Sequence, residues 1–148
     1  MGATATMPVA VIMQRRASTH PWAGDTWGAV GVVPYSGAVR EVLTLVSAPE
    51  RDTYMVPGLD LELYRDEHEG YFENCMAPEA KVFVKWRMED GRAMPVQVSV
   101  SYVDGTRMFD SGEPADGVAM SAEIQAWLVD YLANNYEPPV RKGRARHG

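Results

Sequence analysis

The sequence is poor in the features that tie a chain together covalently or hold it in a membrane. It contains one cysteine, Cys75, in 148 residues, so an internal disulfide cannot form. No segment approaches the run of about 18 apolar residues that spans a bilayer. The apolar stretch 7–13 also lacks the preceding cationic region of a secretion signal. Together with nine methionines, these absences predict one domain in a reducing cytoplasm, without a membrane contact.

Recognisable catalytic motifs are also missing. The three histidines are scattered, and the sequence has neither a G-x-S-x-G elbow nor a Gly-rich phosphate loop. His68 lies in the acidic run 66–69, but this spacing is not a known metal signature and favours a solvated acidic patch. Cys75 has no base beside it in the sequence and is expected to be an ordinary, partly buried thiol. We therefore expect no catalytic set, no metal and no cofactor.

Positive charge is concentrated at the C-terminus. The net charge is −6, and four cations without an acidic neighbour follow the double proline 138–139: Arg141, Lys142, Arg144 and Arg146. The rest of the chain therefore carries −10, which disfavours nucleic acid as a partner. We interpret 138–148 as a flexible basic tail. It is either simply solvated or an electrostatic hook for an acidic partner.

Several segments alternate between apolar and polar residues with a period of two, which is typical of strands with one wet face. One face of 96–102 carries Val96, Val98, Val100 and Tyr102. In 82–88 the apolar residues also share a face, with Phe83 as the exception on the opposite face. Asp90 and Gly91, which lie between these segments, predict a hairpin with a short loop.

The N-terminal half is also mostly β in its pattern. Strands are expected at 8–16, 27–33, 39–46 and 59–63. Pro57 and Gly58 have the order that a type II turn requires, so we expect a turn just before the last of these strands. The charge-dense stretch 65–76 favours a short helix or an irregular crossing.

A helix is predicted at the C-terminal end of the domain. Between Ser121 and Tyr136 one helical stripe carries Ile124, Trp127, Leu128, Tyr131 and Leu132. Ser121 is a good N-cap for this helix. At 104–110 the sequence leaves two alternatives open, a further hairpin or a short helical turn.

These elements predict an α+β protein. We expect one domain over 7–137, built from a mainly antiparallel, twisted sheet of about six or seven strands with the C-terminal helix packed on it. The pattern leaves open whether the sheet curls into a partial barrel. It also leaves open whether an edge strand pairs with a second copy in a homodimer.

Aromatic residues crowd the first half of the chain. The rings are those of Trp22, Trp27, Tyr35, Tyr54, Tyr64, Tyr71 and Phe72. Burial in a core explains such rings more simply than a stacking surface does. An alternative hypothesis is a small-molecule-binding domain or small enzyme, whose pocket is lined by Tyr64, Tyr71, Asn74 and the carboxylates Glu67 and Glu69.

Longer stretches of the sequence resemble the bacterial DUF3305 proteins. The similar segments are MPVAVIMQRR at 7–16, WGAVGVVP at 27–34, LDLELYRDEHEGYFENC at 59–75, and MSAEIQAWLVDYLANNYEPP at 120–139 with the basic tail. The family has no established activity, and its members are associated with formate dehydrogenase, a molybdenum or tungsten enzyme. The resemblance implies an accessory or assembly role without catalytic residues. It also implies a short helix at 102–110, which Gly105 weakens.

The leading hypothesis is therefore a non-enzymatic protein that recognises an oxidoreductase subunit or a maturation factor. An exposed apolar or aromatic patch on the β-rich body would contact this client. The cations of the tail, Arg141, Lys142, Arg144 and Arg146, would steer the encounter towards an acidic surface or a cofactor phosphate.

Overall fold

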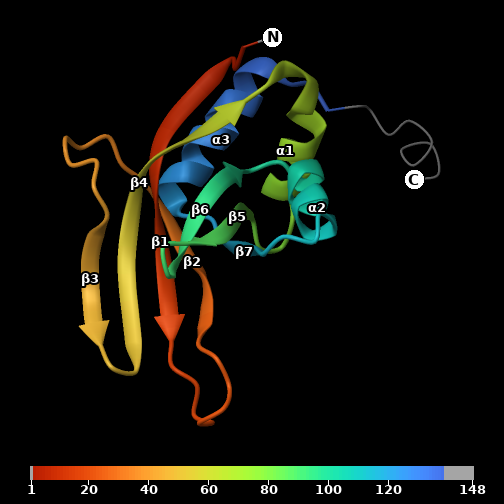
Figure 1. Ribbon diagram of the computed structural model, residues 1–148. Coiled ribbons are helices and arrows are strands. Elements are labelled where there is room, and N and C mark those ends of the chain that lie inside the picture. The colour runs from red at the N-terminus through yellow and green to blue at the C-terminus, as the bar shows by residue number, and fades with distance from the viewer. Residues whose placement is uncertain (1, 139–148) are drawn as a thin grey trace.

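The computed structural model describes residues 2–138, which form two antiparallel sheets and three α-helices (Figure 1). The elements in chain order are β1 (Ala5–Arg16), β2 (Thr26–Pro34), β3 (Leu43–Ala48), β4 (Arg51–Leu63), the 3-10 turn η1 (Arg65–Glu67), α1 (His68–Cys75), β5 (Lys81–Glu89), β6 (Arg92–Ser99), α2 (Tyr102–Asp110), β7 (Ala115–Ala119) and α3 (Ala122–Asn135).

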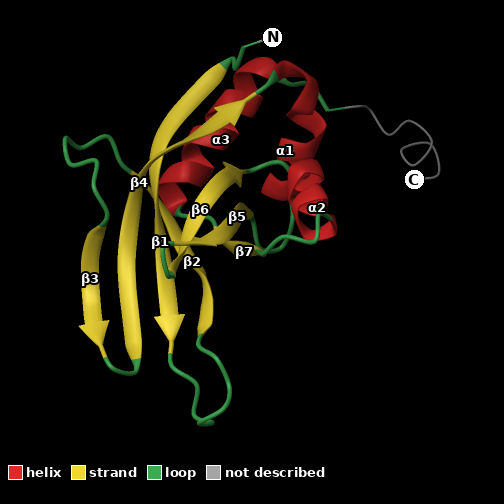
Figure 2. Cartoon of the chain, viewed as in Figure 1, coloured by secondary structure: helices red, strands yellow, loops and turns green. Residues whose placement is uncertain are grey.

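The two sheets differ in length and in how much of them is covered. The larger sheet has the strand order β2-β1-β4-β3, and the smaller sheet has the order β6-β5-β7. Figure 2 shows that the hairpin ends of the larger sheet extend beyond the region where the helices and the smaller sheet lie. The predicted α+β class is confirmed, and the sheets stay open instead of closing into a barrel.

The core lies between the two sheets and α3. Val9 and Leu61 of the larger sheet, Val84 of the smaller sheet and Leu128 of α3 are fully buried in one cluster. The predicted apolar stripe of α3 is confirmed, because four of its five residues are buried and Trp127 packs half-buried against the same cluster. Ser121 caps this helix as predicted, since its Oγ accepts a hydrogen bond from the Ile124 N–H at 3.2 Å.

The predicted hairpin is confirmed at β5 and β6. Asp90 and Gly91 form its two-residue loop, and both have positive φ angles, of 51° and 84°. Two positive φ angles in a two-residue loop match the right-handed twist of the flanking strands, which explains why Asp-Gly is preferred there.

The predicted turn at Pro57 and Gly58 is wrong, because β4 runs through both residues. The pairing of β4 with β1 passes from Leu59 opposite Val9 to Val56 opposite Val11, so β4 holds one extra residue. This is a β-bulge, in which Gly58 takes a φ of 98°. The positive φ was predicted correctly, but it bends a strand instead of ending one.

Three other strand boundaries differ from the prediction, and the first is the start of β4, which lies at Arg51 and not at residue 59. β3 begins at Leu43 and not at residue 39, and β6 ends at Ser99, so Tyr102 belongs to a helix. Ser99 and Ser101, which the alternation placed on a wet face, are buried. The reason is that both hydroxyls bind the N-terminal turn of α2, and the helical alternative for 104–110 is therefore the correct one.

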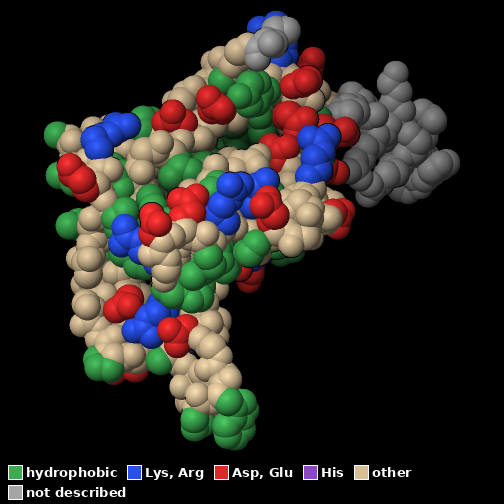
Figure 3. Space-filling view, in the orientation of Figure 1, with side chains coloured by type: hydrophobic (Ala, Val, Ile, Leu, Met, Phe, Trp, Pro, Cys, Tyr) green, Lys and Arg blue, Asp and Glu red, His purple; other side chains and the backbone are tan. Residues whose placement is uncertain are grey.

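One of the aromatic rings is far from the core. Trp22 is 84% exposed in the loop between β1 and β2, so the expectation of a buried ring is wrong here. Figure 3 shows hydrophobic side chains gathered at the end of this projecting loop, while cationic and acidic side chains are interspersed over the rest of the visible face.

Candidate functional site

The predicted hook residues Arg141, Lys142, Arg144 and Arg146 lie outside the described residues. The described chain leaves the body beside α1, where the Tyr136 ring lies 5.8 Å from His68 and 5.5 Å from Phe72, centroid to centroid. The tail therefore starts at the helical side of the molecule.

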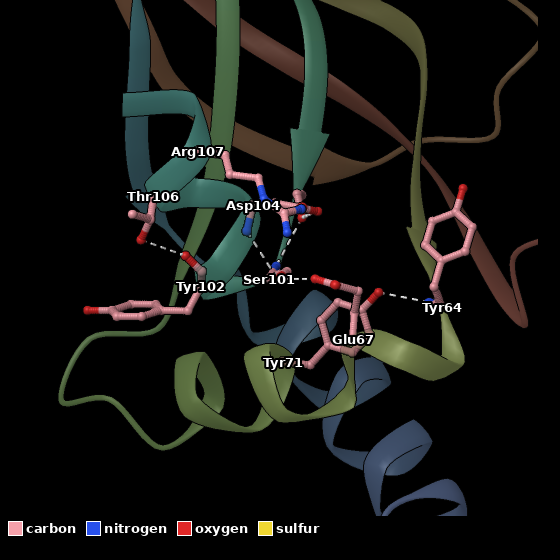
Figure 4. A network of polar contacts seen from close by, with 9 residues as sticks. Tyr64, Glu67, Tyr71, Ser101, Tyr102, Asp104, Thr106 and Arg107 are labelled. Atoms are coloured by element: carbon pink, nitrogen blue, oxygen red, sulfur yellow. Dashed lines mark hydrogen bonds and ion pairs between the residues drawn. The ribbon is translucent and has the colours of Figure 1, made fainter. Parts of the chain in front are cut away.

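The residues proposed for a small-molecule pocket take part in hydrogen bonds within the protein. The Tyr64 N–H donates to Tyr71 Oη at 2.8 Å, and Ser101 Oγ donates to Glu67 Oε1 at 2.9 Å (Figure 4). Burial raises the pKa of Tyr71, so this hydroxyl stays protonated. The Tyr64 side chain itself is bonded elsewhere, since its Oη donates to Glu62 Oε1 at 2.8 Å, and Glu69 is exposed on α1.

Asn74 of the same predicted set is fully buried and connects three segments. Its Nδ2 donates to the carbonyl oxygens of Lys81 at 2.7 Å and Val100 at 2.8 Å. Its Oδ1 accepts from the Lys81 N–H at 3.0 Å. This amide therefore holds the end of α1 against the start of β5 and the residue after β6.

Cys75 is partly buried as expected, whereas His68 packs against the rings of Tyr131 and Tyr136 instead of lying in a solvated acidic patch. His68 Nε2 lies 2.6 Å from Tyr131 Oη, and burial, with a further contribution from Arg65, lowers the pKa of His68. Burial raises the pKa of the Cys75 thiol, which keeps it neutral. Within residues 2–138, no group of three or more His, Cys, Asp or Glu side chains is arranged to hold a metal ion.

A serine and carboxylate network fixes the N-terminus of α2. Ser101 Oγ accepts from the Asp104 N–H at 3.3 Å, and Asp104 Oδ2 accepts from Ser99 Oγ at 2.8 Å. Arg107 adds a contact to Asp104 at 3.4 Å. In Figure 4 the Tyr102 ring points away from this network, towards the opposite side of α2. The network therefore holds the helix while leaving this ring available.

Gly105 allows α2 to lie directly on the smaller sheet. A Cβ atom at this position would be 2.7 Å from the Phe83 ring, which is closer than side chains tolerate. Phe83 is only 5% exposed because the helix covers it. The close approach explains both anomalies in the sequence, the glycine inside a helix and the apolar residue on the outer face of β5.

An open aromatic groove lies along this contact between α2 and the smaller sheet. Its volume is about 410 Å³, and its lining residues are Glu79, Lys81, Phe83, Tyr102, Thr106, Phe109 and Gly117. The Phe83 ring stands at 70° to Tyr102 and at 87° to Phe109, with centroids 6.0 and 6.2 Å apart. Tyr102 is 47% and Phe109 53% exposed. Aromatic residues, Tyr and Phe included, are enriched at protein interfaces relative to the rest of the surface, which makes these two rings candidates for a binding surface.

Charge at the rim of the aromatic groove is balanced. Lys81 Nζ lies 3.6 Å from Glu79 Oε1 at one end. Gly117 of β7 leaves room for the stem of this lysine, since a Cβ there would be 3.0 Å from Lys81 Cδ. The groove is thus an apolar floor with one cation and one carboxylate beside it, which suits binding of an apolar group with a polar flank.

The sequence contained a signal for this site. Tyr102, Thr106 and Phe109 are spaced i, i+4 and i+7, which places them on one helical face. The alternation in 96–102, which predicts a strand as far as Tyr102, hides this spacing. Phe83 breaks the alternation of β5, and only the packing of α2 explains its position.

Comparison with known families gives one match. A family described as a protein of unknown function, DUF3305, matches residues 8–146. No curated protein and no solved structure matches the chain. In the part of the chain that the structure describes, none of the helices has the length and apolar character to cross a membrane. Because the match spans nearly the whole sequence, the chain belongs to the DUF3305 family.

Proposed function

We propose that the protein is a non-enzymatic accessory or assembly protein that binds a subunit or maturation factor of a molybdenum- or tungsten-dependent formate dehydrogenase. It works by protein recognition in the cytoplasm. The choice of client comes from the family resemblance, and the choice of binding as the activity comes from the aromatic groove.

The observation that carries this proposal is the exposure of two large rings on one face of α2. Tyr102 and Phe109 stand on either side of the nearly buried Phe83 and are each about half exposed. Aromatic residues that line a preformed groove lose little conformational entropy on binding and are enriched among the residues that dominate interface affinity.

The experiment that tests this proposal is a direct binding measurement with purified formate dehydrogenase subunits. The full-length protein, Y102S, F109S and V129S are each titrated by biolayer interferometry. V129S is the matched control. Val129 is 51% exposed on α3, so this variant also removes an apolar group from the surface, but away from the aromatic groove. We expect F109S and Y102S to weaken binding by about tenfold each, which is the scale of an interface anchor, and V129S to leave it unchanged.

A lack of binding by the unmodified protein to any subunit would contradict the choice of client. Equal affinity of all four proteins would contradict the aromatic groove as the contact. Either result is interpretable only if far-UV circular dichroism shows that the variants are folded.

A small-molecule ligand is the second candidate function. The aromatic groove, at about 410 Å³, falls within the range of small-ligand sites. Ligand-observed NMR with a library of small aromatic acids tests this candidate, with F109S as the control. Saturable binding of one compound that is lost in F109S, together with no affinity for enzyme subunits, would favour it over protein recognition.

A further inference from the structure

We infer that a cleft between β4 and β6 takes up an extended segment of a partner protein, which adds as a strand to the open edge of β4 and alternates cationic and apolar residues. The inference goes beyond the proposed function, because the cleft shares no lining residue with the aromatic groove. Three features of the molecule lead to it: the pairing of β4, the backbone that borders the cleft and the charge along β4.

β4 is paired on both sides only in its first half. β3 pairs with it from Arg51 to Met55, whereas β1 pairs with it from Arg51 to Leu63. Beyond Met55, the edge of β4 that faces away from β1 has no strand partner among the described residues. Successive residues of a strand direct their N–H and C=O groups to opposite edges, so about every second residue here offers both groups to an added strand.

The cleft separates this open edge from β6, which is an edge strand of the smaller sheet. Its volume is about 390 Å³, and consecutive residues line it on both strands, at 58–60 and at 96–99. Because consecutive side chains point to opposite faces of a sheet, such a lining means that the strand edges border the cleft. Figure 1 shows β6 and the second half of β4 both running towards α1 and α2, so a strand running the other way would be antiparallel to β4.

Two β-bulges limit the length over which an added strand can pair. One lies at Gly58 of β4, and the other leaves Val96 of β6 without a partner on β5. A bulge disrupts the ladder locally, so regular pairing is possible only beyond it. On β4 this leaves 59–63, which at about 3.3 Å per residue is about 17 Å. The bound segment therefore pairs over about five residues.

Carboxylates on β4 select the charge of the bound segment. Asp60 and Glu62 are exposed on one face of β4, while Leu61 between them is buried on the other. Their partners across the ladder with β1 are Pro8 and Thr6, so no cation opposes them there. Opposite charges on directly opposed residues stabilise a strand pair. A lysine or arginine at every second position of the added strand would supply the cations that β1 lacks.

The rest of the cleft adds negative charge and apolar surface. None of its described lining residues is a lysine, an arginine or a histidine, and Asp104 of α2 lies at one end. Within residues 2–138, carboxylates are not grouped as a metal site, so their charge suits a row of cations better than one metal ion. Leu59 and Val98 line the cleft as well, and the apolar residues of the bound segment can cover them.

The test uses fluorescence anisotropy with dye-labelled synthetic peptides of seven residues and the full-length protein. The first peptide alternates Lys and Val. One comparison peptide has Glu in place of Lys, and another has the same composition with all lysines in one block. Two more keep the first sequence but carry backbone N-methyl groups, on every Lys or on every Val. Because N-methyl groups remove N–H donors, one of these two peptides cannot pair with β4.

The protein variants separate the charge of the cleft from the net charge and from the aromatic groove. D60N/E62Q removes two exposed carboxylates of the cleft. E41Q/E123Q is the matched control, because it changes the net charge equally at exposed positions outside the cleft. F109S removes a ring of the aromatic groove.

We expect the first peptide to bind best, and D60N/E62Q to weaken it about tenfold in low salt, with a smaller effect in high salt. E41Q/E123Q and F109S should leave its affinity unchanged. At least one of the N-methylated peptides should lose binding, because a loss of backbone donors matters only if the peptide pairs as a strand.

Equal binding of the Glu peptide or of the block peptide, unchanged binding of both N-methylated peptides, or no binding of the first peptide would each overturn the inference. Two other results would assign the cleft to a different occupant and overturn it too. One is a dimer of the unmodified protein that the first peptide dissociates, measured by sedimentation velocity. The other is tighter peptide binding after Arg141, Lys142, Arg144 and Arg146 are all changed to Gln. The proposed function is tested separately, since it depends on Phe109, which lies outside the cleft.

Discussion

Position 105 requires glycine because of a close steric contact and not because of its backbone conformation. An added Cβ would lie 2.7 Å from the Phe83 ring, and this ring is almost fully buried. Alanine is about 1 kcal/mol better than glycine inside a helix, but overpacking a core contact costs about 1–3 kcal/mol. The difference is about 0–2 kcal/mol, and we predict that G105A lowers the free energy of unfolding by about 1 kcal/mol, measured by urea denaturation.

The matched control for this substitution is G24A. No atom lies within 4 Å of a Cβ at Gly24, so this variant should keep its denaturation midpoint within error. Equal or higher stability of G105A would show that α2 can move away from Phe83, which would also contradict a rigid floor in the aromatic groove.

The buried side chain of Asn74 contributes more to the free energy of unfolding than its polar character suggests. Its side chain makes three hydrogen bonds to backbone groups while fully buried. Removal leaves buried carbonyl and N–H groups without partners, at about 1–3 kcal/mol for each unsatisfied group. We predict that N74A lowers the free energy of unfolding by about 3 kcal/mol, measured by urea denaturation, whereas N134A on the exposed face of α3 changes it little.

At the scale of elements, α1 and α3 are connected by a hydrogen-bonded chain. His68 Nε2 contacts Tyr131 Oη at 2.6 Å, and Tyr131 Oη contacts Thr4 Oγ1 at 2.6 Å. Thr4 Oγ1 donates to the Leu63 carbonyl oxygen at 2.9 Å, so its one proton is committed there. Tyr131 must then donate to Thr4 and accept from His68, which assigns the Nε2–H tautomer to a neutral His68.

Stability should depend on pH through this histidine. Burial lowers the pKa of His68 below its ordinary value of 6.5, so the unfolded chain binds a proton more readily than the folded one. The neutral form therefore contributes stability that is fully present above about pH 6.5. This contribution is lost as the pH falls through the lowered pKa. We predict that the urea midpoint rises between pH 5 and pH 7.

The variant H68F tests whether His68 causes this pH dependence. It keeps a ring beside Tyr136 but cannot take up a proton. The urea midpoint of H68F should change less between pH 5 and pH 7. The control is H20Q in the exposed β1–β2 loop, whose midpoint should change with pH as that of the unmodified protein does. If the urea midpoint of H68F still rises with pH as in the unmodified protein, other groups cause the pH dependence.

The elements that could be predicted from sequence are those whose signal is local. Asp90 with Gly91 defines its loop by backbone preference, and Ser121 defines a helix start by its own side chain. Pro57 and Gly58 gave the right φ but the wrong element, because only pairing with β1 distinguishes a bulge from a turn. The helical face that carries Tyr102 and Phe109 has a local signal in the sequence, but the floor of the aromatic groove has none, since it depends on Phe83 meeting a helix formed about twenty residues later.

At the scale of the whole molecule, one carboxylate connects the two sheets. Asp116 of β7 accepts a hydrogen bond from the Ala29 N–H of β2 at 2.9 Å and from Trp86 Nε1 of β5 at 2.8 Å, both at Oδ2. This contact also occupies a backbone donor of β2, an edge strand of the larger sheet. The two sheets thus share a core on one side and a polar connection at their margin.

Loss of this connection should destabilise the protein without separating the sheets. Hydrogen bonds to a charged group contribute about 1.5–3 kcal/mol each, so D116A should lower the free energy of unfolding by about 3 kcal/mol. D60A, an exposed aspartate on β4, should change it little. Because the shared core remains, unfolding of D116A followed by tryptophan fluorescence and by far-UV circular dichroism should still coincide. Two separate transitions would mean instead that the sheets are independent units and that Asp116, not the core, makes them cooperative.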